Sequence, residues 1–156
     1  MEQRDAFDDY PIPALLRHAR GTYGLAIRIR LSADGLSDLP RNGPYLVGGL
    51  ANGASAEQLL REMHLSDAQS ERLLGALLEG HFVEAADDTE ANDALALRNT
   101  DKGLRAARAV AEAIAGVNHE LSHMLTPEEL RGFRNALVAL SAIKERTEES
   151  LHEHPH

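Results

Sequence analysis

The sequence contains no cysteine among its 156 residues. This absence excludes disulfides, thiolate metal ligands, cysteine nucleophiles and thiol redox chemistry. Lysine is scarce too, since Lys102 and Lys144 are the two lysines and arginine supplies most of the positive charge. No apolar run approaches the roughly 20 residues of a membrane-spanning helix, and the N-terminal segment MEQRDAFDDY lacks the apolar stretch of a signal peptide. We therefore expect a cytoplasmic protein that does not contact a membrane.

The signatures of common enzyme classes are missing as well. The sequence has no glycine-rich phosphate loop, no G-x-S-x-G elbow and no H-E-x-x-H zinc motif. These absences favour a binding protein over an enzyme, and they predict no catalytic residue and no cofactor.

Negative charge dominates the composition. The 16 lysines and arginines face 25 aspartates and glutamates, which gives a formal net charge of −9. A nucleic-acid-binding protein usually carries a basic face, so the overall charge argues against nucleic acid unless the basic residues cluster.

The apolar periodicity predicts a chain that is mostly helical. A stripe at three- and four-residue steps predicts a first helix over residues 12–31, followed by a loop rich in glycine and proline and a short helix over residues 45–50. Two capping boxes, beginning at Ser55 and Ser66, then open two short helices separated by His64 and Leu65. This is the spacing of a helix-turn-helix.

Two predicted strands follow the helix-turn-helix. Gly80 closes the second helix, Phe82 and Val83 begin one strand, and residues 94–98 alternate as a returning strand. A helix-turn-helix followed by a hairpin is a winged helix. Thr100 then caps a long helix, and Thr126-Pro-Glu-Glu opens the last one, whose apolar seam suits helix–helix packing within or between chains.

This order of elements resembles the MarR family of bacterial transcription regulators. The resemblance spans residues 12–149 and rests on LLREMHLSDAQSERLLGALLEG, HFVE, the NTDKG junction and LTPEELRGF. It implies a mainly α fold with a two-stranded β-wing and a homodimer that releases DNA when a small aromatic or phenolic ligand binds. The implied division is a loose segment 1–11, a single domain 12–149 with a dimer base of 12–34 and 104–149 and a winged-helix lobe of 45–103, and a flexible histidine-containing tail 150–156.

The resemblance places DNA contacts on the second helix of the helix-turn-helix and on the wing. The expected DNA-binding residues are Ser66, Gln69, Ser70, Arg72 and Arg98. The family's wing usually carries two arginines that enter the minor groove, but this sequence has the acids Glu90 and Asp93 at those positions. Residues 55–98 hold three arginines and ten acids, a formal charge of −7.

These charges leave two functions open. The first is a MarR-like transcription regulator with altered or weakened DNA binding that responds to a ligand. The alternative is a MarR-fold protein that has lost DNA binding and acts by binding a protein partner or a small molecule. The candidate ligand residues are a cation, an imidazole and two phenols: Arg17, His18, Tyr23 and Tyr45.

The histidines of the long helix are the candidate metal ligands. His119 and His123 lie four residues apart, a spacing that could place two imidazoles on one ion. The sequence supplies no further ligand, so solvated histidines near the dimer base are the simpler interpretation, and we predict no metal site.

Overall fold

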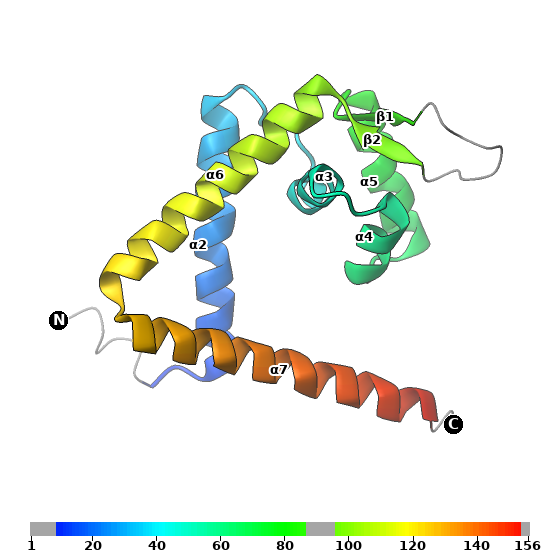
Figure 1. The fold of residues 1–156 in the computed structure, drawn as a ribbon. Helices are drawn as coiled ribbons and strands as arrows, with labels where there is room; N and C mark the ends of the chain where they lie inside the picture. The colour runs from blue at the N-terminus through cyan, green and yellow to red at the C-terminus, as the bar shows by residue number, and fades with distance from the viewer. Residues whose placement is uncertain (1–8, 87–95, 154–156) are drawn as a thin grey trace. The chain divides into compact units, whose positions relative to one another are not determined.

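The computed structural model describes residues 9–86 and 96–153. This part of the chain forms helices with one two-stranded antiparallel sheet (Figure 1). The predicted fold class, a mainly α winged helix, is confirmed. The elements in chain order are α2 (Ile12–Ala33), α3 (Gly43–Ala51), α4 (Ala56–Glu62), α5 (Asp67–Glu79), β1 (Val83–Ala85), β2 (Leu97–Asn99), α6 (Asp101–Met124) and α7 (Pro127–Glu153).

The chain divides into two compact units, residues 1–117 and 118–156, with the boundary inside α6. The predicted dimer base draws residues from both units, and the predicted division into base and lobe stays a prediction.

The core of the first unit collects apolar side chains from every helix of that unit and from β1. Its largest side chains with almost no exposed surface are Phe82, Leu36, Leu46, Leu77 and Val47. Because burial of a large apolar side chain contributes about 1.5–3 kcal/mol, this cluster is the main source of stability for the winged lobe.

The end of α5 sets where the sheet begins. Gly80 ends the helix with ordinary helical φ, and His81 takes the left-handed conformation at φ 58°. Amide N–H groups of His81 and Phe82 donate to the carbonyls of Leu78 and Leu77, at 3.1 and 2.9 Å. This is a Schellman ending, which turns Phe82 back into the core against Leu77.

The junction between the sheet and α6 explains the T-x-x-G step, Thr100 to Gly103, within the NTDKG motif of the sequence. The hydroxyl of Thr100 lies 2.5 Å from the carbonyl oxygen of His81 and accepts a hydrogen bond from the N–H of Gly103 at 3.1 Å. Gly103 packs against the carbonyl of Phe82 so closely that a β-carbon there would overlap the oxygen. The motif therefore fixes the start of α6 against the strand entry.

The two strands pair in a short antiparallel register. Val83 lies opposite Asn99, Glu84 opposite Arg98, and Ala85 opposite Leu97. The returning strand starts later than the sequence predicted, at Leu97. Most of the segment between the strands, residues 87–95, lies outside the described residues.

The second unit consists of the end of α6 and the helix α7. The predicted capping box at Thr126 is confirmed: its N–H donates to Glu129 Oε2 at 2.8 Å, and Thr126 Oγ1 accepts from the N–H of Glu129 at 3.2 Å. No described residue of α7 is buried within the single chain. No described helix is long and apolar enough to cross a membrane.

Candidate nucleic-acid interface

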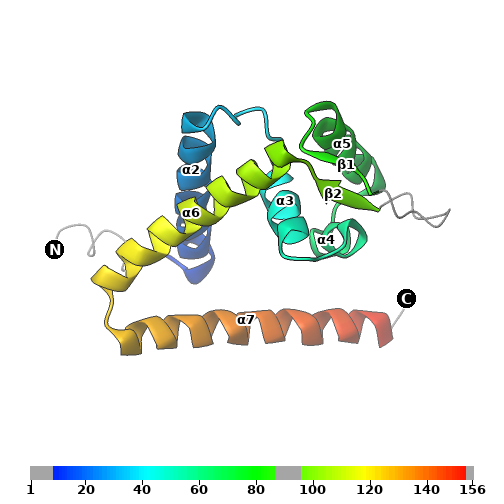
Figure 2. The same ribbon diagram turned by 45° about the horizontal axis from the view of Figure 1, so that its top comes forward.

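The helices α4 and α5 form the predicted pair of short helices across a tight turn, as Figure 2 shows from a second direction. Ser66 caps α5 with both halves of a capping box. Its hydroxyl accepts from the N–H of Gln69 at 3.2 Å, and Gln69 Oε1 accepts from the N–H of Ser66 at 3.0 Å. The turn before it holds His64 at φ 51°, a conformation that few side chains adopt without strain.

The capping box uses two of the expected DNA-binding side chains. The hydroxyl of Ser66 and the amide oxygen of Gln69 bond the helix terminus, which leaves the Gln69 amide group as a donor for a further contact. Ser70 is half-buried. Arg72 is exposed, and its Nε lies 3.4 Å from the carbonyl oxygen of Ala68 one turn earlier. The five expected DNA contacts stay a prediction.

Acids already pair with the other arginines of this lobe. Arg98 on β2 donates to Glu84 Oε1 on β1 at 2.9 Å, directly across the strand pair. On α4, Arg61 lies 3.7 Å from Glu57 one turn away. An arginine that contacts a phosphate must first give up such a partner.

The exposed face of α5 is itself acidic. The helix carries three exposed carboxylates and one exposed guanidinium, a formal charge of −2. The charged residues are Asp67, Glu71, Arg72 and Glu79. The wing acids Glu90 and Asp93, predicted to replace arginines, lie outside the described residues.

A hydrogen-bond network joins α3 to α4. The hydroxyl of Tyr45 donates to Glu62 Oε2 at 2.6 Å, and the amide of Gln58 donates to Glu62 Oε1 at 3.0 Å. The hydrogen bond to Glu62 raises the pKa of Tyr45, and the same bond lowers the pKa of Glu62. The hydroxyl of Tyr45, a candidate ligand residue, thus bonds the neighbouring helix α4.

The other three candidate ligand residues lie on α2. Arg17 is exposed, Tyr23 is half-buried, and the ring of His18 lies 5.9 Å from the ring of Tyr10. A cavity between the end of α2 and α6 contains none of these three residues, nor Tyr45. The ligand role of the four residues stays a prediction.

The two histidines of α6 lie close together. Their ring centroids are 4.4 Å apart in an edge-to-face arrangement, and His123 Nδ1 lies 2.8 Å from the carbonyl oxygen of His119. No group of three or more potential ligands surrounds a metal position anywhere in residues 9–86 and 96–153.

Lys102 makes three contacts that the sequence did not predict. Its ammonium group lies 2.6 Å from Asp38 Oδ2, donates to the carbonyl of Gly80 at 2.8 Å, and sits 4.2 Å from the centre of the Phe82 ring. The hydrogen bond from Lys102 lowers the pKa of Asp38. One lysine in the NTDKG junction thus ties the loop after α2 and the end of α5 to α6.

Comparison with solved structures identifies this arrangement. The MarR family protein Rv2887 of Mycobacterium tuberculosis is 20% identical, with a TM-score of 0.55 over 86% of this chain and 96% of that one. Rv1404 from the same organism is 16% identical, with a TM-score of 0.62 over 83% and 89% of the chains. This chain has the MarR fold.

Two further structures of MarR-fold proteins hold ligands. Rv2887 has been solved with salicylic acid, at 22% identity, a TM-score of 0.54 and coverage of 85% and 98%. A mutant of MepR from S. aureus has been solved bound to an oligodeoxyribonucleotide, at 14% identity, a TM-score of 0.50 and coverage of 86% and 98%. No protein-family model and no curated protein matches the sequence. At these identities the likeness establishes the fold, and function has to be argued from the residues.

Proposed function

We propose that the chain is a homodimeric MarR-type transcription regulator with weakened DNA binding that responds to a small ligand. The observation that carries the proposal is the exposed N-terminal half of α5, which follows α4 across a tight turn. In a helix-turn-helix this half enters the major groove and presents its side chains to the base edges. Here Gln69 and Arg72 are the exposed donors suited to that task.

The weak affinity follows from the charges of the lobe. Phosphate contacts supply most non-specific affinity, and each one adds about −0.9 to the slope of log K against log salt. Arg61 and Arg98 are already paired with carboxylates, and α5 carries a net charge of −2. If Arg61 and Arg98 of each protomer exchange their carboxylates for phosphates, the dimer makes four contacts and the slope is about −4, compared with −5 to −9 for six to ten contacts.

A second copy of the chain is the partner that the helices favour. On α2, Ile12, Leu25 and Ile29 are 65%, 51% and 62% exposed. On α7, Val138 and Leu151 are 68% and 70% exposed. Apolar side chains gathered on long helices indicate an interface, and MarR-type regulators need two lobes to meet two half-sites.

The ligand proposal rests on a relative and on residue chemistry. Rv2887, which shares the fold, has been solved with salicylic acid. Arg17, His18, Tyr23 and Tyr45 offer the cation and the aromatic groups that an aromatic or phenolic acid requires. The expected effector of this chain is therefore a small aromatic or phenolic molecule.

The test is a salt titration of binding to the DNA upstream of the chain's own gene, with a random duplex of equal length as control. A working regulator prefers the upstream duplex and gives a slope near −4. Arg72→Ala then weakens specific binding about tenfold, within the 1–3 kcal/mol of a base contact. Arg131→Ala, which removes an exposed arginine from α7, leaves binding unchanged.

The acidic surface of α5 favours one alternative: a MarR-fold protein that has lost DNA binding and binds a protein partner or a small molecule instead. If neither duplex binds at low salt, this alternative replaces the first. The double variant Glu90→Arg, Asp93→Arg then shows which part of the protein is responsible for the loss of DNA binding. A gain of DNA affinity assigns the defect to the wing, whereas no gain assigns it to α5 or to the spacing of the two lobes.

A further inference from the structure

The ammonium group of Lys102 holds the C-terminal end of α5. It donates at 2.8 Å to the carbonyl of Gly80, the residue that caps α5, and at 2.6 Å to Asp38 Oδ2 in the loop after α2. It also lies 4.2 Å from the centre of the Phe82 ring, at the entry to β1. All of these residues belong to the first unit. One positive charge therefore joins the end of α5 to α6 and to the loop between α2 and α3.

The charge of this lysine stabilises α5 rather than its own helix. Lys102 follows directly on the first residue of α6, where the partial positive charge of a helix N-terminus disfavours a cation. The carbonyl groups at the C-terminal end of α5 carry the opposite partial charge, and they lack partners within that helix. The ammonium group therefore acts as a cap on α5 that another helix supplies.

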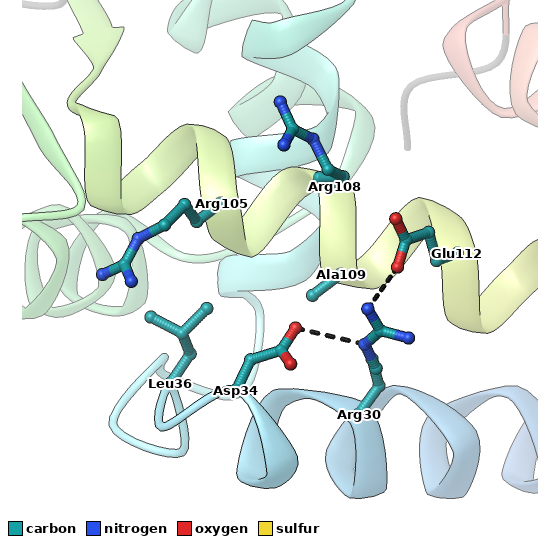
Figure 3. A pocket seen from close by; sticks show the side chains of 7 residues that line it. All are labelled: Arg30, Asp34, Leu36, Arg105, Arg108, Ala109 and Glu112. Atoms are coloured by element: carbon teal, nitrogen blue, oxygen red, sulfur yellow. Dashed lines mark hydrogen bonds and ion pairs between the residues drawn. The ribbon is translucent and has the colours of Figure 1, made fainter.

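The loop that carries Asp38 is itself fixed. Leu36 is only 1% exposed, and its N–H donates at 2.8 Å to a carbonyl in the last turn of α2. At the end of α2, Arg30 pairs with Asp34 and with Glu112 of α6. Figure 3 shows Arg30 between these two carboxylates, where it bridges α2 and α6. Because the loop is held from both helices, its carboxylate is a fixed anchor for the ammonium group.

We propose that Lys102 is a positioning residue that sets the angle at which α5 presents its N-terminal half to DNA, an inference that rests on the proposed DNA binding. Leu73 and Leu77 fix the buried side of α5 in the core, and Lys102 fixes its C-terminal end. The helix is about 18 Å long, so a tilt of about 10° at the anchored end moves its first turn by about 3 Å.

Such a displacement matters for base contacts and not for charge. A hydrogen bond from Gln69 or Arg72 to a base edge tolerates a change of about 0.5 Å in its length. Attraction between an arginine and a phosphate falls off gradually with distance. Loss of the anchor therefore lowers the preference for specific DNA while the electrostatic part of binding stays in place.

The experiment repeats the salt titration of the full-length protein with Lys102→Met, which keeps an unbranched apolar side chain over the Phe82 ring and removes the ammonium group. We expect binding to the upstream duplex to weaken about tenfold, the value of one base contact, with binding to the random duplex and both salt slopes unchanged. A lysine that contacted a phosphate would weaken both duplexes alike and flatten the slope by about 0.9 per protomer. That result, or an unchanged preference for the upstream duplex, would overturn the proposal.

A second measurement needs no DNA. Amide hydrogen exchange of His81 and Phe82, whose N–H groups donate to the last turn of α5, should become about tenfold faster in Lys102→Met. The amide of Val47, on the buried face of α3, is the reference and should keep its rate. Unchanged exchange at His81 and Phe82, or equal acceleration at Val47, contradicts a local anchor. If the parent binds neither duplex, the proposed function fails, and these exchange rates alone decide whether Lys102 anchors α5.

Matched variants assign the effect to the named contacts. Asp38→Asn removes the carboxylate anchor and leaves the bond to Gly80, so it should reduce the preference for the upstream duplex less than Lys102→Met does. In the Lys102→Met background the same change should have no further effect, and additive losses would show that Asp38 does not act through Lys102. Lys144→Met, the same substitution at the exposed lysine of α7, should bind both duplexes like the parent.

Discussion

One substitution made at two positions of α6 tests how the wing is joined to the rest of the first unit. Gly103→Ala places a β-carbon against the carbonyl oxygen of Phe82 and 2.9 Å from Asn99 Oδ1. The first neighbour is backbone, so no rotamer change relieves the overlap. Gly116→Ala, in the same helix, places the same β-carbon where no atom lies within 4 Å.

The two variants should change stability in opposite directions. Replacing glycine by alanine inside a helix gains about 0.8–1.0 kcal/mol at either position. At Gly103 the overlap forces a backbone shift, and overpacking of this kind costs about 1–3 kcal/mol, with backbone contacts at the upper end. The net expectation is a loss of about 2 kcal/mol for Gly103→Ala and a gain of about 1 kcal/mol for Gly116→Ala.

Thermal unfolding followed by circular dichroism measures both changes. For a chain of this length, 1 kcal/mol shifts Tm by roughly 2–4 °C, so Gly103→Ala should lower Tm by about 4–8 °C and Gly116→Ala should raise it by about 2–4 °C. Equal protomer concentrations are needed, because self-association makes Tm concentration-dependent. A Tm for Gly103→Ala equal to or above that of the parent would refute the packing of the T-x-x-G step against Phe82.

Three further substitutions test neighbouring contacts by the same thermal assay. His81→Gly should raise stability by up to about 1 kcal/mol, because the side chain at φ 58° is strained, and an unchanged or lower Tm would count against that strain. Phe82→Ala should cost about 3–5 kcal/mol, since the ring is fully buried in the core; a loss below about 1 kcal/mol would be inconsistent with it. Asp38 has its pKa lowered by Lys102 from an ordinary value of 3.8, so its contribution is present above pH 3.8 and is lost as pH falls through the lowered value. Asp38→Asn should therefore lower Tm at pH 7, the difference from the parent should shrink as the pH falls below 3.8, and a Tm difference independent of pH would exclude the ion pair as its cause.

Local signals in the sequence predicted the helix starts well. The boxes at Ser66 and Thr126 fix where α5 and α7 begin, because the capping residue and its partner lie three positions apart in the chain. The predicted end of α5 at Gly80 is confirmed, because Gly80 caps the helix after Glu79. The sequence did not predict that the next residue, His81, takes the left-handed conformation, or that the ring of Phe82 takes the space that a side chain at residue 80 would need.

The contacts that build the candidate sites join residues far apart in sequence. Tyr45 bonds Glu62 across 17 positions, and Lys102 reaches Asp38 across 64. Periodicity shows that each helix has an apolar face but not which polar residue of another helix faces it. The sequence likewise contains no signal for the cavity between the end of α2 and α6, because the wall of that cavity forms only when the two helices lie together.

The ion pairs of the winged lobe do not by themselves prevent DNA binding. Arg98 and Glu84 are about half exposed, and exposed pairs of this kind contribute about 0–1 kcal/mol. Exchanging such a carboxylate for a phosphate therefore costs little at one site. The unpaired carboxylates of α5 act differently, because no exchange removes them from the vicinity of the DNA, and salt screens their repulsion along with the attraction of the arginines. Added salt thus lowers the affinity of this lobe less than that of a basic lobe, which makes the slope of the salt titration, rather than the affinity at one salt concentration, the measure of the net balance between phosphate contacts and the repulsion of the α5 carboxylates.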